Sequence, residues 1–176
     1  MKVLFRLTVV GLASVLGLVH APAAAQTLRI GLQEDPDRLD PAQGGTFVGR
    51  IVFAALCDKL IDVDAKLNYQ PQLATEWAWN EDGKALTLKL RPGVVFHDGT
   101  PLDGEAVKAN LERYRTADYS RRKGEVKSIA NVAVIDPLTV RIELSEPDAP
   151  LLSVLADRAG MMLSPKALTE IGRAHV

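Results

Sequence analysis

Residues 73–102 read LATEWAWNEDGKALTLKLRPGVVFHDGTPL, a stretch whose alternation indicates a small sheet. Apolar and polar residues alternate over 76–80 and again over 85–90, which is the period of a strand with one buried face. Between them lies Asp82-Gly83, a pair typical of tight hairpin turns. The stretch therefore predicts a β-hairpin.

Two tryptophans, Trp77 and Trp79, fall on one face of the first predicted strand. We expect the bulky indoles to cover the small sheet, and stacking on a ligand is the alternative.

The spacing of apolar residues predicts further elements on either side of the hairpin. Strands are predicted over 27–32, 59–63, 126–135, 138–144 and 161–163, and helices over 47–57 and 103–115, from about 149 and from 164. Asp103 is the expected N-cap of the helix over 103–115. The polar, basic segment 119–124 is expected to be a solvated loop. About 145 residues remain after the first 25, which suits one domain with one sizeable core.

A polar loop over residues 33–45 precedes the helix over 47–57. Two Asp-Pro steps and a Gly pair stop any strand or helix there. Thr46 can then cap the helix. The apolar face of this helix, which we expect to be buried, contains Phe47, Ile51, Ala54 and Ala55.

The first 25 residues have the layout of a secretory signal peptide. Two basic residues accompany an apolar run over residues 7–19, which as a helix of about 20 Å is shorter than a hydrocarbon core of about 30 Å. Ala23 and Ala25 supply the small side chains that a signal peptidase requires, so cleavage is predicted before Gln26.

The charge balance disfavours nucleic acid as a partner. Removal of residues 1–25 takes away two basic residues and no acidic one, which leaves 19 basic against 22 acidic residues and a net charge of −3. The single cysteine, Cys57, excludes an internal disulfide. We expect it to be a small core side chain rather than a reactive thiol.

The last six residues, IGRAHV over 171–176, fit the codons ATC GGA AGA GCA CAC GTC, which resemble a common sequencing-adapter oligonucleotide. We therefore interpret residues 171–176 as a non-native tail and expect the natural protein to continue. An ordinary helix C-terminus with Gly172 as its cap is the alternative.

Residues 73–102 also resemble the signature of the peptide/nickel-type (family 5) extracellular solute-binding proteins of ABC transporters. The positions that carry the resemblance, to which the family gives a structural role, are Trp77, Asp82, Gly83, Leu90, Arg91, Gly93, Phe96, Asp98 and Gly99. Flanking matches occur at Leu39-Asp40-Pro41 and over residues 136–147.

The resemblance implies an α/β fold of the periplasmic-binding-protein-like type II class, in which two lobes close over a ligand. Members of this family are much longer than this chain. By resemblance, residues 26–50 are the start of lobe one with its first strand and a ligand-side loop. Residues 51–170 are then most of the extra small α+β domain and the return toward lobe one, and the opposing lobe is missing.

The resemblance also places a ligand beside the loop after the first strand and the start of the next helix. The candidate ligand-binding residues are Glu34, Gly44, Gly45, Thr46 and Phe47. Amides at a helix start suit a ligand carboxylate or carbonyl, and Glu34 suits a cationic group. The alternatives are a solvated loop acid for Glu34 and a core position for Phe47.

The function implied by the resemblance is that of a receptor and not an enzyme. It is a monomeric periplasmic protein that binds di- or oligopeptides or a similar small solute, closes by a hinge and delivers the solute to an ABC permease and ATPase. No cofactor or metal is implied. The alternative is an exported ligand-sensing co-receptor on the same fold. An exported hydrolase is disfavoured, because His97 is the only histidine outside the signal peptide and the tail.

Overall fold

The computed structural model describes residues 27–170, so the predicted signal peptide and the predicted tail over 171–176 lie outside the described residues. From Leu32 onward the described chain belongs to one compact unit. No helix among the described residues is both long and apolar enough to cross a bilayer.

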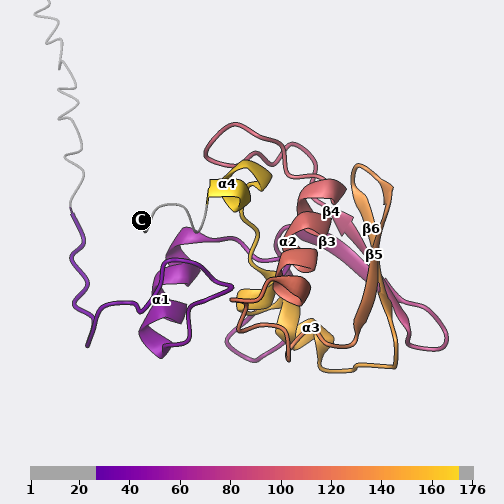
Figure 1. The fold of residues 1–176 in the computed structure, drawn as a ribbon, viewed down its shortest axis with the longest axis horizontal. Helices are drawn as coiled ribbons and strands as arrows, with labels where there is room; N and C mark the ends of the chain where they lie inside the picture. Colours follow the sequence, from indigo (N-terminus) through magenta and orange to yellow (C-terminus); the bar gives the residue numbers. More distant parts are fainter. Residues whose placement is uncertain (1–26, 171–176) are drawn as a thin grey trace, which may run out of the picture. The chain divides into compact units, whose positions relative to one another are not determined.

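A four-stranded antiparallel sheet organises the unit (Figure 1). Its strands, in the order in which they pair, are β3 (Ala74–Trp79), β4 (Ala85–Leu90), β6 (Thr139–Leu144) and β5 (Ile129–Asp136). The pairs β3–β4 and β5–β6 join strands that are consecutive in the sequence. Both predicted hairpins are therefore confirmed.

The two tryptophans lie on the core side of the sheet. Trp77 is paired with Leu88 and Trp79 with Leu86, and both indoles are half-buried and pack against the core. The prediction that they cover the sheet is confirmed.

Helix α2 (Gly104–Thr116) packs against β5 and β6 and closes the core over the sheet. Its N-cap is Asp103, whose carboxylate accepts a hydrogen bond of 2.9 Å from the Ala106 amide, as the sequence predicts. A side chain at Gly104 would lie 2.7 Å from Val134 Cγ1, so glycine permits the close approach of helix and sheet. The fully buried residues of this core include Leu86, Leu88, Val107, Leu111, Tyr114, Val132, Val140 and Ile142.

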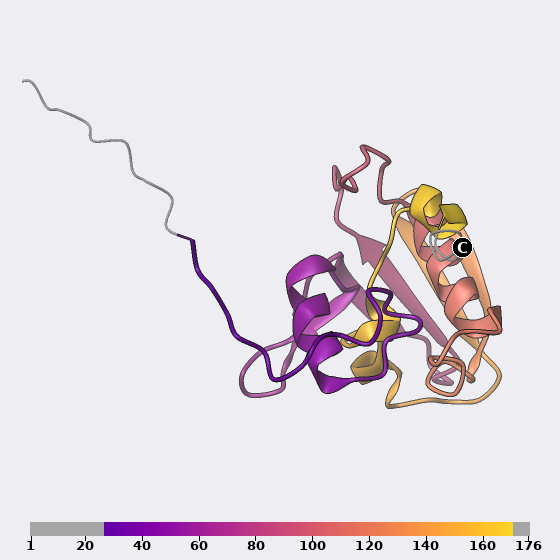
Figure 2. The same ribbon diagram turned by 60° about the vertical axis from the view of Figure 1, so that its left-hand side comes forward.

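The remaining elements lie outside the four-stranded sheet. They are α1 (Phe47–Leu56), β1 (Ile61–Val63), β2 (Tyr69–Pro71), α3 (Leu151–Leu155), the 3-10 helix η1 (Arg158–Gly160) and α4 (Pro165–Glu170), of which α4 contacts α2. Figure 2 shows the segment that contains α3 lying between α1 and the sheet. Leu60 joins these parts, because its amide donates to the Gly160 carbonyl and its carbonyl accepts from the Ala74 amide, each at 2.8 Å.

Helix α1 begins where the sequence predicts, but the predicted buried face is wrong. Its buried residues are Val48, Gly49 and Phe53, whereas Phe47 is 71% and Ile51 43% exposed. The helix is apolar on both sides, so local spacing could not decide which side meets the core. The predicted division between residues 50 and 51 falls inside α1.

Three further expectations differ from the structure. Residues 27–32 form no strand, and residues 161–163 contribute only a single bridge from Met161 to Lys59. A strand needs a neighbour for its amides and carbonyls, and these segments lack a continuous one among the described residues. The segment 119–124 is not simply solvated, because Ser120 and Arg122 are buried.

Candidate ligand-binding site

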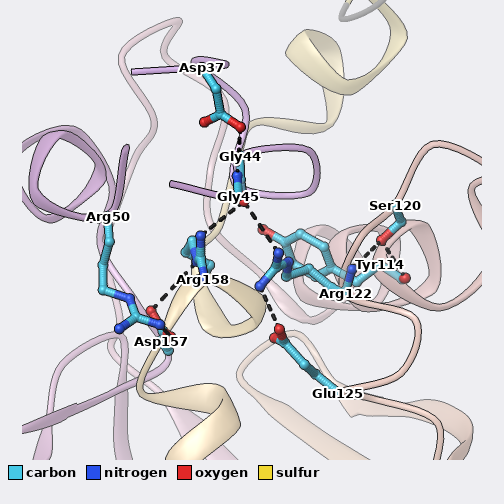
Figure 3. Close-up of polar contacts among 10 residues, drawn as sticks. All are labelled: Asp37, Gly44, Gly45, Arg50, Tyr114, Ser120, Arg122, Glu125, Asp157 and Arg158. Atoms are coloured by element: carbon cyan, nitrogen blue, oxygen red, sulfur yellow. Dashed lines mark hydrogen bonds and ion pairs between the residues drawn. The ribbon is translucent and has the colours of Figure 1, made fainter. Parts of the chain in front are cut away.

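The amides that precede α1 already meet a carboxylate of the same chain. Asp37 accepts a hydrogen bond of 2.9 Å from the Gly45 amide (Figure 3). It also accepts one of 3.2 Å from the Thr46 hydroxyl. The bond from Gly45, together with those from Thr46, lowers the pKa of Asp37 below its ordinary value. The positive end of α1 therefore holds an anionic group that belongs to the chain itself, and the predicted ligand carboxylate at this place stays a prediction.

Thr46 joins this carboxylate to the helix. Its Oγ1 accepts a hydrogen bond of 3.0 Å from the Gly49 amide, which is the capping bond of α1, while the same hydroxyl donates to Asp37. The conformation of the loop and the start of the helix are therefore linked through one hydroxyl group.

A buried ion pair lies at the base of the loop. Asp40 is 5% exposed, its Oδ2 pairs with Arg113 Nη2, and its Oδ1 accepts a hydrogen bond of 3.0 Å from the Ala42 amide. The Asp40 carbonyl accepts from the Gly44 amide at 2.8 Å, which closes the turn. The guanidinium of Arg113 also stands over the Tyr119 ring, 5.4 Å from its centroid.

Two more buried arginines meet at one backbone carbonyl. The Gly44 oxygen accepts a hydrogen bond of 2.9 Å from Arg158 Nη1 and one of 3.2 Å from Arg122 Nη2 (Figure 3). Arg122 also pairs with Glu125, on the side away from the loop. The carbonyl is thus held from two different parts of the chain.

The structure brings four of the five candidate ligand-binding residues together and leaves one apart. Gly44 is buried beneath the loop, Gly45 is exposed and Thr46 is half-buried, and Phe47 presents an exposed ring at the first turn of α1. The core alternative for Phe47 is thereby wrong. Glu34 is exposed and has no hydrogen bond or ion pair with any other described residue.

Sequence reasoning missed the residues that fix this loop. Asp37 had a usable signal, since an acid shortly before a Gly-Gly-Thr helix start suits the positive end of the helix. Arg122 and Arg158 had none, because they lie 78 and 114 positions from Gly44.

The residues of the family signature lie in two turns and their supports. Arg91 donates to the Gln72 carbonyl through Nε and Nη2, at 3.0 and 2.9 Å. Gly93 and Gly99 have positive φ angles of 74° and 83°, which explains glycine at both positions. The other signature residues serve the hairpin and the core: Trp77, Asp82, Gly83, Leu90 and Phe96.

Asp98 connects the second of these turns to α4. Its carboxylate accepts hydrogen bonds from the Ser164 hydroxyl and from the Thr100 hydroxyl and amide. These bonds lower the pKa of Asp98 to about 2, and the bond from Ser164 contributes most to this shift. The carboxylate is therefore a structural acceptor and stays ionised at neutral pH.

A hollow of about 280 Å³, with both polar and apolar residues in its lining, lies between the end of α1 and residues 94–97. Cys57 and His97 are among the residues that line it. Burial, followed by the charge of Asp58, raises the pKa of the Cys57 thiol, which makes it a poor nucleophile at neutral pH. Among residues 27–170 no three metal-ligating side chains stand close enough to hold a metal ion.

Residues 68–172 match the family described as bacterial extracellular solute-binding proteins, family 5, middle region. The chain belongs to this family, and its fold is that of the type II periplasmic binding proteins.

Curated relatives are similar over nearly the whole chain. The glutathione-binding protein GsiB of Salmonella paratyphi A is 33% identical over 168 residues, which cover 95% of this chain and 33% of that protein. GsiB of Escherichia coli K12 is 32% identical over the same shares of the two chains. This chain thus spans about a third of the length of the curated relatives it matches.

Solved structures show the same fold. AgaA from A. tumefaciens R10, in complex with agropinic acid, has a TM-score of 0.72 and 28% identity over 77% of this chain and 28% of its own. MoaA from the same source, in complex with mannopinic acid, has a TM-score of 0.73 and 28% identity over 80% of this chain and 30% of its own.

Proposed function

We propose that the protein is the periplasmic solute-binding component of an ABC importer, and that its solute is a short peptide or a similar small molecule. The observation that carries the proposal is the family match over residues 68–172, in a chain whose fold is that of the type II binding proteins. Binding by hinged closure follows from that architecture, because a ligand that contacts both lobes stabilises the closed form.

The ligand class rests on the relatives. The curated relatives at 32–33% identity are glutathione-binding proteins, and glutathione is a small peptide-like molecule with two carboxylates. Relatives of known structure bind agropinic acid and mannopinic acid, which are also small polar acids. A short peptide with a free carboxylate is therefore the first ligand to test.

The loop over residues 33–46 and the first turn of α1 are the proposed contribution of this chain to the cleft. The exposed ring of Phe47 offers an apolar contact surface at 71% exposure. Gly45 is exposed beside it, and its amide, which donates to Asp37, would meet a ligand carboxylate only by exchanging that partner. Glu34 is assigned to a cationic group of the ligand, and its exposure leaves it free to make that contact.

The partners and the location follow from the same proposal. The protein is exported, is cleaved before Gln26, acts as a monomer in the periplasm and delivers its solute to a membrane permease and its ATPase. No catalytic step is proposed, since the relatives are binding proteins.

The test is a thermal-shift experiment on the full-length mature protein with reduced glutathione, trialanine and agropinic acid. A ligand that binds only the folded state raises the melting temperature, by an amount that corresponds to about 2.7 kcal/mol at a hundredfold excess over Kd. We expect glutathione or trialanine to raise it without being cleaved, as followed by mass spectrometry. Cleavage of either peptide, or no shift with any of the three, would contradict the proposal.

A matched pair of variants tests the location of the site. Phe47→Ala and Leu67→Ala both remove an exposed side chain, 71% and 79% exposed, so neither should change stability. Only Phe47→Ala should weaken binding of the active probe. Equal affinities in the two variants would remove Phe47 from the site.

A further inference from the structure

The loop over residues 33–46 is fastened in two different ways. Its outer part is attached through the exposed carboxylate of Asp37, which meets Gly45 and Thr46. Its base, around Gly44, is attached through side chains that are nine-tenths or more buried. The outer attachment can exchange with water, whereas the inner one cannot without opening the fold.

The inner attachment is built from three separate stretches of chain. Arg113 comes from the last turn of α2, Arg122 from the turn after it and Arg158 from η1, and they are 8%, 4% and 7% exposed. Arg113 holds the Asp40 carboxylate, and the other two hold the Gly44 carbonyl. All three guanidinium groups therefore contact the turn over residues 40–44.

The approach to the Gly44 carbonyl depends on close packing at Gly44 itself. A side chain at Gly44 would lie 2.6 Å from the ring of Phe53, so only glycine fits between the turn and α1. The Gly44 backbone therefore packs closely against the Phe53 ring, while its carbonyl accepts from the two arginines.

The cluster is arranged to specify a conformation rather than to add stability. Nε of Arg122 and Nε of Arg158 are buried, and neither has a hydrogen-bond partner among the described residues. Burial, followed by the charge of Arg122, lowers the pKa of Arg158 below its ordinary value. Buried charges of this kind contribute little net stability, and their best-attested use is to select one arrangement.

We propose that Arg122 and Arg158 are positioning residues of the binding site, which fix the Gly45 amide and the start of α1 by clamping the Gly44 carbonyl. They set ligand affinity without contacting the ligand. The clamp, which is the pair of hydrogen bonds from Arg122 and Arg158 to the Gly44 carbonyl, is formed entirely by residues of this chain. Its effect on ligand affinity rests on the proposed function.

Hydrogen exchange followed by mass spectrometry tests the clamp in the full-length mature protein. The variants are Arg122→Gln and Arg158→Gln, and the control is Arg141→Gln, an arginine on the outer face of the sheet that is 47% exposed. We expect amide exchange over residues 40–46 to rise at least about tenfold in the two clamp variants, through local opening. Exchange in β4 and β6 should stay at the level of the control.

Two results would overturn the clamp. One is unchanged exchange over residues 40–46. The other is a rise that is equal in the loop and in β4, which would mean that the arginines only stabilise the whole fold. A third variant, Arg158→Lys, keeps the positive charge and can still donate to the Gly44 carbonyl. Its loop amides should therefore exchange more slowly than those of Arg158→Gln.

Affinity for reduced glutathione provides the second measurement, by calorimetry on the same proteins. Arg158→Gln is expected to weaken binding at least about tenfold, while Val132→Ala, a core variant at a fully buried position, lowers the melting temperature without changing affinity. Faster loop exchange with unchanged affinity would refute the positioning role. If glutathione does not bind the unaltered protein, the proposed ligand is wrong, and the exchange experiment still decides the clamp.

Discussion

The sheet with α2 and the loop with α1 are held together by different forces. The first region buries apolar side chains on every element, and Leu88, Leu111 and Ile142 are completely covered. The second exposes much of its apolar surface, as at Phe47, and is held at its base by buried arginines. The sheet region can therefore tolerate loss of single polar contacts, whereas the loop depends on a few polar contacts for its shape.

The largest effect should come from the buried aromatic ring of α1, which packs against the turn at Gly44. Phe53 is 1% exposed and Phe47, on the same helix, is 71% exposed. Phe53→Ala is expected to lower the free energy of unfolding by about 3–5 kcal/mol, through lost burial and a cavity. Phe47→Ala should change it by less than about 0.5 kcal/mol. Urea denaturation measures both, and similar values would mean that α1 is packed by its other face.

The next effect concerns the buried ion pair at the base of the loop. Asp40→Asn leaves Arg113 buried without its counter-charge, so we expect a loss of about 3 kcal/mol in the free energy of unfolding. Asp118→Asn breaks an exposed pair with Lys123 and should leave the free energy of unfolding nearly unchanged, because solvent screens the pair. The double variant Asp40→Asn/Arg113→Met should be more stable than Asp40→Asn alone. If it is less stable, the contacts of Arg113 with Tyr119 dominate.

A smaller effect is expected at the N-caps of the two helices. Asp103→Ala and Thr46→Ala each remove one capping hydrogen bond, and each should lower the free energy of unfolding by about 1 kcal/mol. Only Thr46→Ala should also speed exchange of the Gly45 amide, because it loosens Asp37. Exchange of that amide at the unaltered rate would show that Asp37 holds the loop without Thr46.

The smallest effect is the change in the free energy of unfolding with pH that Asp98 causes. Its pKa in the folded protein, about 2, lies below the ordinary value of 3.8. A lowered folded pKa stabilises the protein above the ordinary value, and this contribution is lost as the pH falls from about 4 through about 2. Asp98→Asn should therefore flatten the stability curve between pH 5 and 2 relative to the unaltered protein, as followed by circular dichroism. Ser164→Ala should flatten it in part, and an unchanged slope in both variants would count against the assignment.

Much of the fold could be predicted from neighbouring residues. The alternation around Asp82-Gly83 predicted the hairpin of β3 and β4, and Asp103 predicted the start of α2, because both signals depend on contacts within a few positions. The buried face of α1 could not be predicted in this way. Val48 and Phe53 compete there with Phe47 and Ile51, and only the packing of the turn at Gly44 against the Phe53 ring decides between them.

The sequence by itself determined the family, the hairpins and the capped helices, and it predicted a candidate site at residues 44–47. Each depends on local spacing or on a run of residues that can be compared directly. Only the tertiary structure decided what holds that site. The Asp37 carboxylate occupies the amides before α1, and Arg122 and Arg158 reach Gly44 from 78 and 114 positions away. Such contacts form because burial leaves a carbonyl that must be paired, and no local pattern records which distant donor will pair with it.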